Sequence, residues 1–129
     1  MVFYRSRIEL EGMKELAKRA VACKGWQWMP GMLSSDTGLR LDEFTLEKDW
    51  EAKYPDLSDP ATLGCLLALV RAAWKDEGCA AVVASYTFES GYRWRVVGGH
   101  HHGSGFMAMS QKHYQTEAET LVAALEAAP

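Results

Sequence analysis

The sequence is poor in cysteine, and the cysteines that it has are widely separated. Cys23, Cys65 and Cys79 are the three in 129 residues, and no two of them form a CxxC pair. An odd number at wide spacing argues against a disulfide framework and against a zinc knuckle. Isolated cysteines in apolar segments usually pack as small buried side chains in a reduced compartment. The pattern therefore predicts a cytoplasmic protein with free thiols.

The sequence also lacks an excess of positive charge and any long hydrophobic run. Its formal net charge of -3 is opposite in sign to the balance that a chain-wide nucleic-acid surface requires. No apolar run approaches the roughly 20 residues that span a bilayer, and the N-terminus lacks the apolar region of a signal peptide. With 48% hydrophobic and 24% charged residues, the composition predicts one folded soluble domain over residues 1–129.

Two segments in the first half of the chain have the spacing and end signals of helices. Residues 13–24 place apolar side chains on one face and stop before Gly25, which suits a left-handed helix end. Residues 60–75 begin at a proline after a candidate capping residue, Asp59 or Ser58. This second segment is apolar on every side, so we expect it to be buried on every side.

The C-terminal segment predicts a third helix, over residues 116–128. Thr116 and Glu119, three positions later, form a capping box at its start. The residues that recur at helical spacing behind this cap, and that we expect to face the core, are Ala118, Leu121, Val122 and Leu125.

Five segments have the alternation of strands and are separated by turn residues. Trp26 and Trp28 fall on one face of the first strand, and Leu39 and Leu41 on one face of the second. The sequence ESG between the third and fourth strands predicts a tight hairpin. The five predicted strands are residues 26–33, 38–44, 80–88, 91–97 and 105–110.

The predicted order of elements is α-β-β-α-β-β-β-α, which is typical of an α+β domain with a mostly antiparallel sheet. Helices on both faces of that sheet would make a three-layer α-β-α sandwich. Two interpretations of residues 1–12 stay open, an extra strand or a tail, and Met13 is an alternative start.

Three segments of the chain resemble one family. They are LAKRAVACKGWQWMPGM, DLSDPATLGCLLALVRAAW and TEAETLVAALEAA, all within residues 13–128. Together they resemble small proteins of tailed bacteriophages and prophages described as phage ABA-sandwich domain proteins. The resemblance implies a three-layer α-β-α sandwich that is encoded by phage or prophage DNA and made in the cytoplasm of a bacterial host. It implies no activity, cofactor or catalytic residue.

The predicted helix over residues 60–75 carries a candidate interface. Its small residues recur every four positions, and such a row lets another backbone approach closely. Two interpretations stay open: the chain covers this face itself, or a second copy covers it in a homodimer, since exposed apolar patches usually mark partners. The candidate interface residues are Gly64, Cys65, Ala68, Leu69 and Ala72.

The sequence GGHHHGSGF, at residues 98–106, holds a candidate metal site. His100 and His102 share one side of an extended chain, and His113 follows soon after. Zinc and nickel take imidazole nitrogens, but a site needs three or four converging ligands and this loop has no carboxylate. We therefore expect a solvated loop and no resident cofactor, with adventitious binding of nickel or zinc.

Residues 92–114 hold a candidate nucleic-acid surface. Arg93 and Arg95 lie on one face of a predicted strand, Lys112 follows, and aromatic residues stand between them. Arginines on a strand face bind phosphates or bases in some DNA-binding domains. The acidic chain as a whole opposes such binding.

These patterns favour a non-enzymatic binding or accessory protein of phage type that self-associates. A nucleic-acid-binding module is the alternative, and a metal-dependent enzyme at the histidine loop is the third hypothesis. The cysteines and carboxylates show no arrangement typical of a nucleophile or a general acid.

Overall fold

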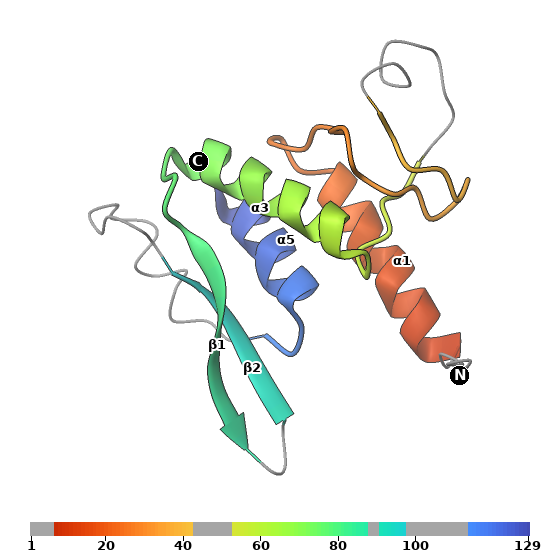
Figure 1. Cartoon of the computed structure of the whole chain (residues 1–129). Coiled ribbons are helices and arrows are strands. Elements are labelled where there is room, and N and C mark those ends of the chain that lie inside the picture. The colour runs from red at the N-terminus through yellow and green to blue at the C-terminus, as the bar shows by residue number, and fades with distance from the viewer. Residues whose placement is uncertain (1–6, 43–52, 88–90, 98–113) are drawn as a thin grey trace.

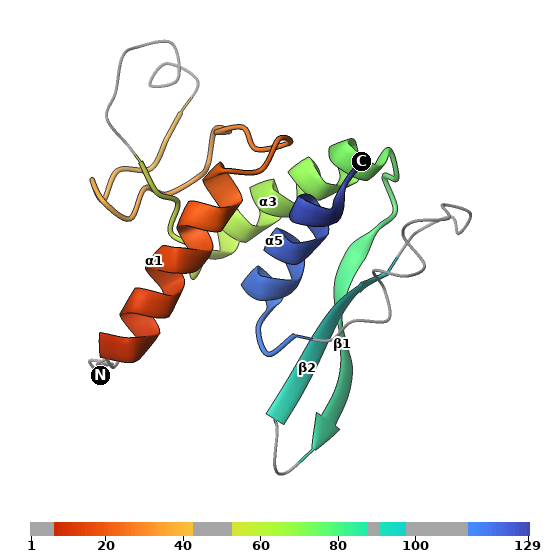
Figure 2. The same ribbon diagram turned by 180° about the vertical axis from the view of Figure 1, so that it is seen from behind.

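A computed structural model describes residues 7–42, 53–87, 91–97 and 114–129. Figure 1 shows three helices grouped together and a two-stranded hairpin that extends beyond them, and Figure 2 shows the same arrangement from behind. The described elements are α1 (Arg7–Val21), α3 (Pro60–Trp74), β1 (Ala80–Thr87), β2 (Gly91–Val97) and α5 (Glu117–Ala127). The α+β class is therefore confirmed. The predicted order of eight elements in three layers is not, and the predicted strand over residues 105–110 lies outside the described residues.

Helix α5 is the centre of the fold, because it contacts α1, α3 and both strands. The Thr116 hydroxyl accepts a hydrogen bond from the Glu119 amide at 3.1 Å, so the predicted cap is confirmed. The four residues predicted to face the core are all buried. The buried residues of α5 are Ala118, Thr120, Leu121, Val122, Ala123, Ala124 and Leu125. This last helix, and not the apolar segment 60–75, is the one enclosed on most sides.

Helix α3 begins and ends close to the predicted positions. Asp59 is its N-cap, Pro60 is its first residue, and it ends at Trp74 before Lys75, which adopts a left-handed conformation with φ 54°. Its buried face packs on α5. The residues of that face are Thr62, Leu66, Leu69 and Val70. The expectation that α3 is buried on every side is wrong, since Gly64 and Ala72 are exposed.

Helix α1 begins at Arg7 rather than at Met13, so residues 7–12 are neither a strand nor a tail. Four of the six residues in this segment, Arg7, Glu9, Leu10 and Glu11, are good helix formers, although Gly12 is not. Ile8 is 82% exposed and Leu10 54% exposed. Core contact on α1 starts further along, at Leu16, Ala17 and Ala20, which are buried.

The two strands predicted over residues 26–33 and 38–44 are wrong within the described part, which ends at Asp42. This segment forms an irregular strap that closes through an isolated bridge between Leu33 and Arg40. The predicted turn between them is present, because the Gly38 amide donates to the Ser34 carbonyl at 2.9 Å. Pro30 supplies no amide hydrogen and Gly31 takes a φ of +99°, so a regular ladder is interrupted there.

Leu39 and Leu41 do not share a face of this strap, contrary to the strand prediction. Leu39 is 61% exposed, whereas Leu41 is 3% exposed and belongs to the core. The backbone of Leu41 is fixed by two hydrogen bonds of 2.8 Å, to Gly31 and to Met32. Trp26 and Trp28 do lie together, with ring centroids 5.4 Å apart in an edge-to-face contact.

Strands β1 and β2 form the predicted antiparallel hairpin, with Ala81 opposite Val96 and Val82 opposite Arg95. Val96 is 1% exposed and belongs to the same hydrophobic core as the buried residues of α5. Because side chains alternate along a strand, Arg95 and Arg93 lie on the face opposite to Val96. Among the described helices, none is long and apolar enough to cross a membrane.

Candidate functional site

The candidate interface on α3 is divided by the fold. Leu69 is only 7% exposed because it packs on the chain's own core, so its assignment to the outer face is wrong. Gly64 and Ala72 are exposed, and Cys65 and Ala68 are half-buried. A Cβ atom placed on Gly64 would meet nothing within 4 Å. The part of the candidate interface that remains accessible to a partner is the row of small residues one helical turn apart, Gly64, Ala68 and Ala72.

The exposed residues of α3 are small and uncharged. They are Pro60, Ala61, Gly64 and Ala72. Arg71, the one charged residue of the helix, is half-buried and lies three positions from Ala68, so it borders this row. Its Nε donates to the Cys79 carbonyl at 2.8 Å. A surface helix usually places charged or polar residues on its outer face. A row of small apolar residues on an exposed helix face is typical of a surface that meets a partner.

The Asp59 carboxylate joins the strap to the start of α3. It accepts two hydrogen bonds of 2.9 Å from the Arg40 guanidinium, and its Oδ2 accepts from the amide and hydroxyl of Thr62. The Thr62 hydroxyl in turn accepts from the Leu33 amide at 2.9 Å. The Arg40 guanidinium, together with the bonds from Thr62, holds the pKa of Asp59 well below its usual range. Sequence analysis identified the cap but not its arginine.

The Asp36 carboxylate is a second attachment point, and sequence analysis missed it. It accepts from the backbone amides of Lys53 and Tyr54 at 3.0–3.1 Å and from the Ser34 hydroxyl at 2.7 Å. Partial burial raises the pKa of Asp36, but these hydrogen bonds outweigh it and the net pKa is lowered. Both carboxylates are thus ionised and fully occupied in holding the strap, which is a structural role.

We expect Asp59→Ala to lower the free energy of unfolding by about 2 kcal/mol, because it removes the cap and a charged hydrogen-bond acceptor. The native pKa of Asp59 lies below that of the unfolded chain. Its stabilisation is therefore complete above the unfolded pKa, about 4, and is lost as the pH falls through the lower native value.

Urea unfolding at a series of pH values measures this effect. Asp59→Asn is the matched control, because asparagine keeps the cap and removes the charge. The difference between wild type and Asp59→Asn should be constant from pH 7 to pH 5 and shrink below about pH 4. A difference that does not change with pH would contradict the assigned ion pair.

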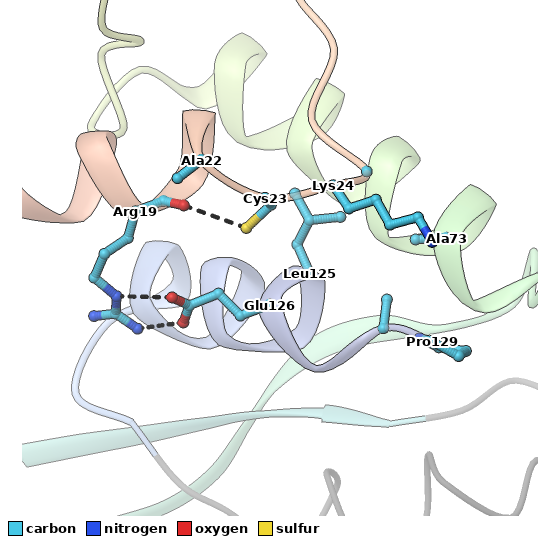
Figure 3. A pocket seen from close by; sticks show the side chains of 10 residues that line it. Arg19, Ala22, Cys23, Lys24, Ala73, Leu125, Glu126 and Pro129 are labelled. Carbon is cyan, nitrogen blue, oxygen red and sulfur yellow. Dashed lines mark hydrogen bonds and ion pairs between the residues drawn. The ribbon is translucent and has the colours of Figure 1, made fainter.

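A groove of about 560 Å³ lies where the C-terminal ends of α1 and α5 approach α3. Figure 3 shows that Arg19 and Glu126 form a two-pronged ion pair at its edge and that the Cys23 thiol donates to the Arg19 carbonyl. Burial raises the pKa of the Cys23 thiol, and Glu126 adds to that effect. A protonated thiol is a poor nucleophile, so the groove holds no activated cysteine.

The other two cysteines agree with the predicted packing role. Cys65 is half-buried and Cys79 is fully buried, and all three thiols are free. Burial is the first cause of the raised pKa of each. Sequence analysis placed them as small apolar side chains, and their surroundings here are apolar.

A second groove, of about 410 Å³, separates the first half of α1 from the segment that precedes α3. Leu10, Ala17 and Leu57 line it, together with Asp36 and Asp56. The Asp36 carboxylate is occupied as described above, and the Asp56 carboxylate accepts from the amide of Ser58 at 2.9 Å. Neither carboxylate is therefore a free general acid or base.

The predicted nucleic-acid residues fall partly within the described structure. Arg93 and Arg95 are half-buried on β2, and Lys112 lies outside the described residues. The Arg95 Nε is buried and has no hydrogen-bond partner.

The predicted metal residues His100, His102 and His113 also lie outside the described residues. Within the described ranges, no three histidine, cysteine, aspartate or glutamate side chains are grouped as a metal site. The histidine loop therefore stays a sequence-based prediction.

Comparison of the chain with models of protein families, with curated proteins and with solved structures finds no match in any of the three. The geometry of the described surfaces therefore carries the functional argument. Two of the described surfaces differ from ordinary solvated protein: the exposed row of small residues on α3, and the arginine-bearing face of the hairpin.

Proposed function

We propose that this chain is a non-enzymatic binding protein that self-associates through the exposed face of α3. The observation that carries the proposal is that every exposed residue of α3 is a proline, an alanine or a glycine. In water such a face gains nothing from charge or hydrogen bonding. Contact with a similar face would remove its apolar atoms from water.

The spacing of the small residues suits contact between two copies of α3. Gly64, Ala68 and Ala72 lie four residues apart and form one ridge, and ridges of this kind interdigitate when two helices cross. Without large side chains, the two helix axes can approach to the short end of the usual range, about 8 Å. A two-fold axis near Ala68 would place Gly64 of each copy against Ala72 of the other.

Light scattering at micromolar concentration tests the proposal, and we expect wild type to have the mass of a dimer. Ala72→Arg should give a folded monomer, because a charged side chain would be desolvated in the interface while it stays in solvent in the monomer. Arginine is also tolerated near a helix C-terminus.

Ala127→Arg is the matched control, because it places the same side chain on an exposed alanine near the end of α5. This control should remain a dimer. A monomeric wild type would overturn the proposal. A dimer that withstands Ala72→Arg would place the interface on another surface.

The phage origin belongs to the same proposal. Two of the segments that carry the family resemblance correspond to α3 and α5, and the first covers the end of α1 and part of the strap. We include a cytoplasmic location in a bacterial host and the absence of a resident cofactor. Nickel or zinc held by the histidine loop would be adventitious.

A further inference from the structure

Two arginines differ from the other arginines whose contacts the structure describes. Arg19 is paired with Glu126, Arg40 with Asp59, and Arg71 donates to a backbone carbonyl. Within the described part of the chain, Arg93 and Arg95 have no hydrogen bond or ion pair, and the Nε of Arg95 is buried. Among these five arginines, three have an acceptor, and Arg93 and Arg95 have none within the described part of the chain.

The positions of Arg93 and Arg95 place both charges on one surface. They are two residues apart on β2, which separates their Cα atoms by about 6–7 Å, on the face opposite to the buried Val96. Val82 lies opposite Arg95 on the neighbouring strand, and it contributes no charge that could neutralise either arginine.

A buried guanidinium N–H without an acceptor is costly, because it has lost its hydrogen bonds to water. The buried Nε of Arg95 is out of reach of a ligand at the surface, so an anion bound at this face would accept hydrogen bonds from the terminal nitrogens of the two guanidinium groups. Phosphate is well suited, since the planar guanidinium fork donates to two of its oxygens at once. Successive phosphates along a nucleic-acid strand would meet the two arginines in turn.

We propose that the arginine-bearing face of the β1–β2 hairpin binds the phosphate backbone of double-stranded DNA. The shape of the hairpin favours a duplex over an acidic protein, because the major groove admits a two-stranded antiparallel ribbon. Figures 1 and 2 both show the hairpin extending past the helices, so that its far end is not flanked by α1, α3 or α5. The net charge of -3 opposes approach of DNA, and binding is therefore confined to this face.

Fluorescence anisotropy of the full chain with a labelled duplex of about 20 base pairs tests this inference. We expect wild-type binding to weaken steeply as salt rises from low to physiological concentration. Arg93→Gln and Arg95→Gln should each weaken binding about tenfold. The double variant should reduce the slope of log K against log salt by about 2.

Lys24→Gln and Lys53→Gln together form the charge-matched control, since both lysines are exposed and lie away from the hairpin. This control should keep the wild-type affinity and salt slope. Absence of salt-dependent binding by wild type would overturn the inference without reference to any variant. Equal losses in the control and in the arginine variant would also overturn it, as would stronger competition by polyglutamate than by unlabelled duplex.

The inference is independent of self-association. If the Ala72→Arg variant is monomeric and still binds the duplex, DNA binding does not depend on self-association. An experimental structure in which a second helical layer covers Arg93 and Arg95, as the sandwich prediction requires, would contradict DNA binding at this face.

Discussion

Leu121→Ala is expected to lower the free energy of unfolding by about 3 to 5 kcal/mol. Leu121 is completely buried in α5, the helix that contacts every other described element. Removing its side chain loses buried apolar area and leaves a cavity that neighbours on several elements would have to fill. A loss of this size is a large part of the total stability of a small domain. Urea unfolding followed by tryptophan fluorescence measures it.

Leu10→Ala is the matched control for this prediction. It removes the same atoms from α1, where Leu10 is 54% exposed. We expect its effect to stay within about 0.5 kcal/mol, as for most surface substitutions. If both variants lost the same stability, α5 would not be the centre of the core.

Leu41→Ala is expected to cost about 3 kcal/mol, whereas Leu39→Ala should change stability by less than about 0.5 kcal/mol. The two leucines are two positions apart in the strap, but Leu41 is 3% exposed and Leu39 is 61% exposed. A regular strand would place both on one face, and their substitutions would then cost similar amounts. Parallel unfolding curves of the two variants measure the difference.

Equal losses at Leu39 and Leu41 would support the strand that the sequence predicts and contradict the irregular strap. Equal losses near zero would mean that the strap does not pack on the core. The pair is therefore a test of the backbone path and not merely of burial.

The helices could be predicted from the sequence because their signals are local. Asp59 and Pro60 start α3, and Thr116 with Glu119 starts α5, each within one helical turn. The start of α1 could not be placed, because residues 7–12 form a helix by propensity and their exposed Ile8 and Leu10 mimic strand alternation.

The strap could not be predicted, since its conformation depends on partners far along the chain. Asp36 is held by amides at residues 53 and 54, and Arg40 by Asp59. Local alternation around Leu39 contains no information about these contacts. The same holds for Arg19 and Glu126, which are 107 positions apart.

The candidate surfaces were predictable to different degrees. The row of small residues on α3 is visible at four-residue spacing, but the burial of Leu69 depends on where α5 packs. The placement of Arg93 and Arg95 on one face of β2 can be predicted from the alternation of the sequence. Their lack of hydrogen-bond acceptors can be seen only in the structure, by comparison with the other described arginines.

The central place of α5 has a consequence for synthesis on the ribosome. Its residues are translated after those of α1, α3 and the hairpin, which all pack on it. Until α5 emerges, the apolar faces of the earlier elements have no common partner, and exposed apolar surface of this kind promotes aggregation. The nascent chain therefore completes its core late, and chaperones that shield apolar segments have access to α1 and α3 until α5 emerges.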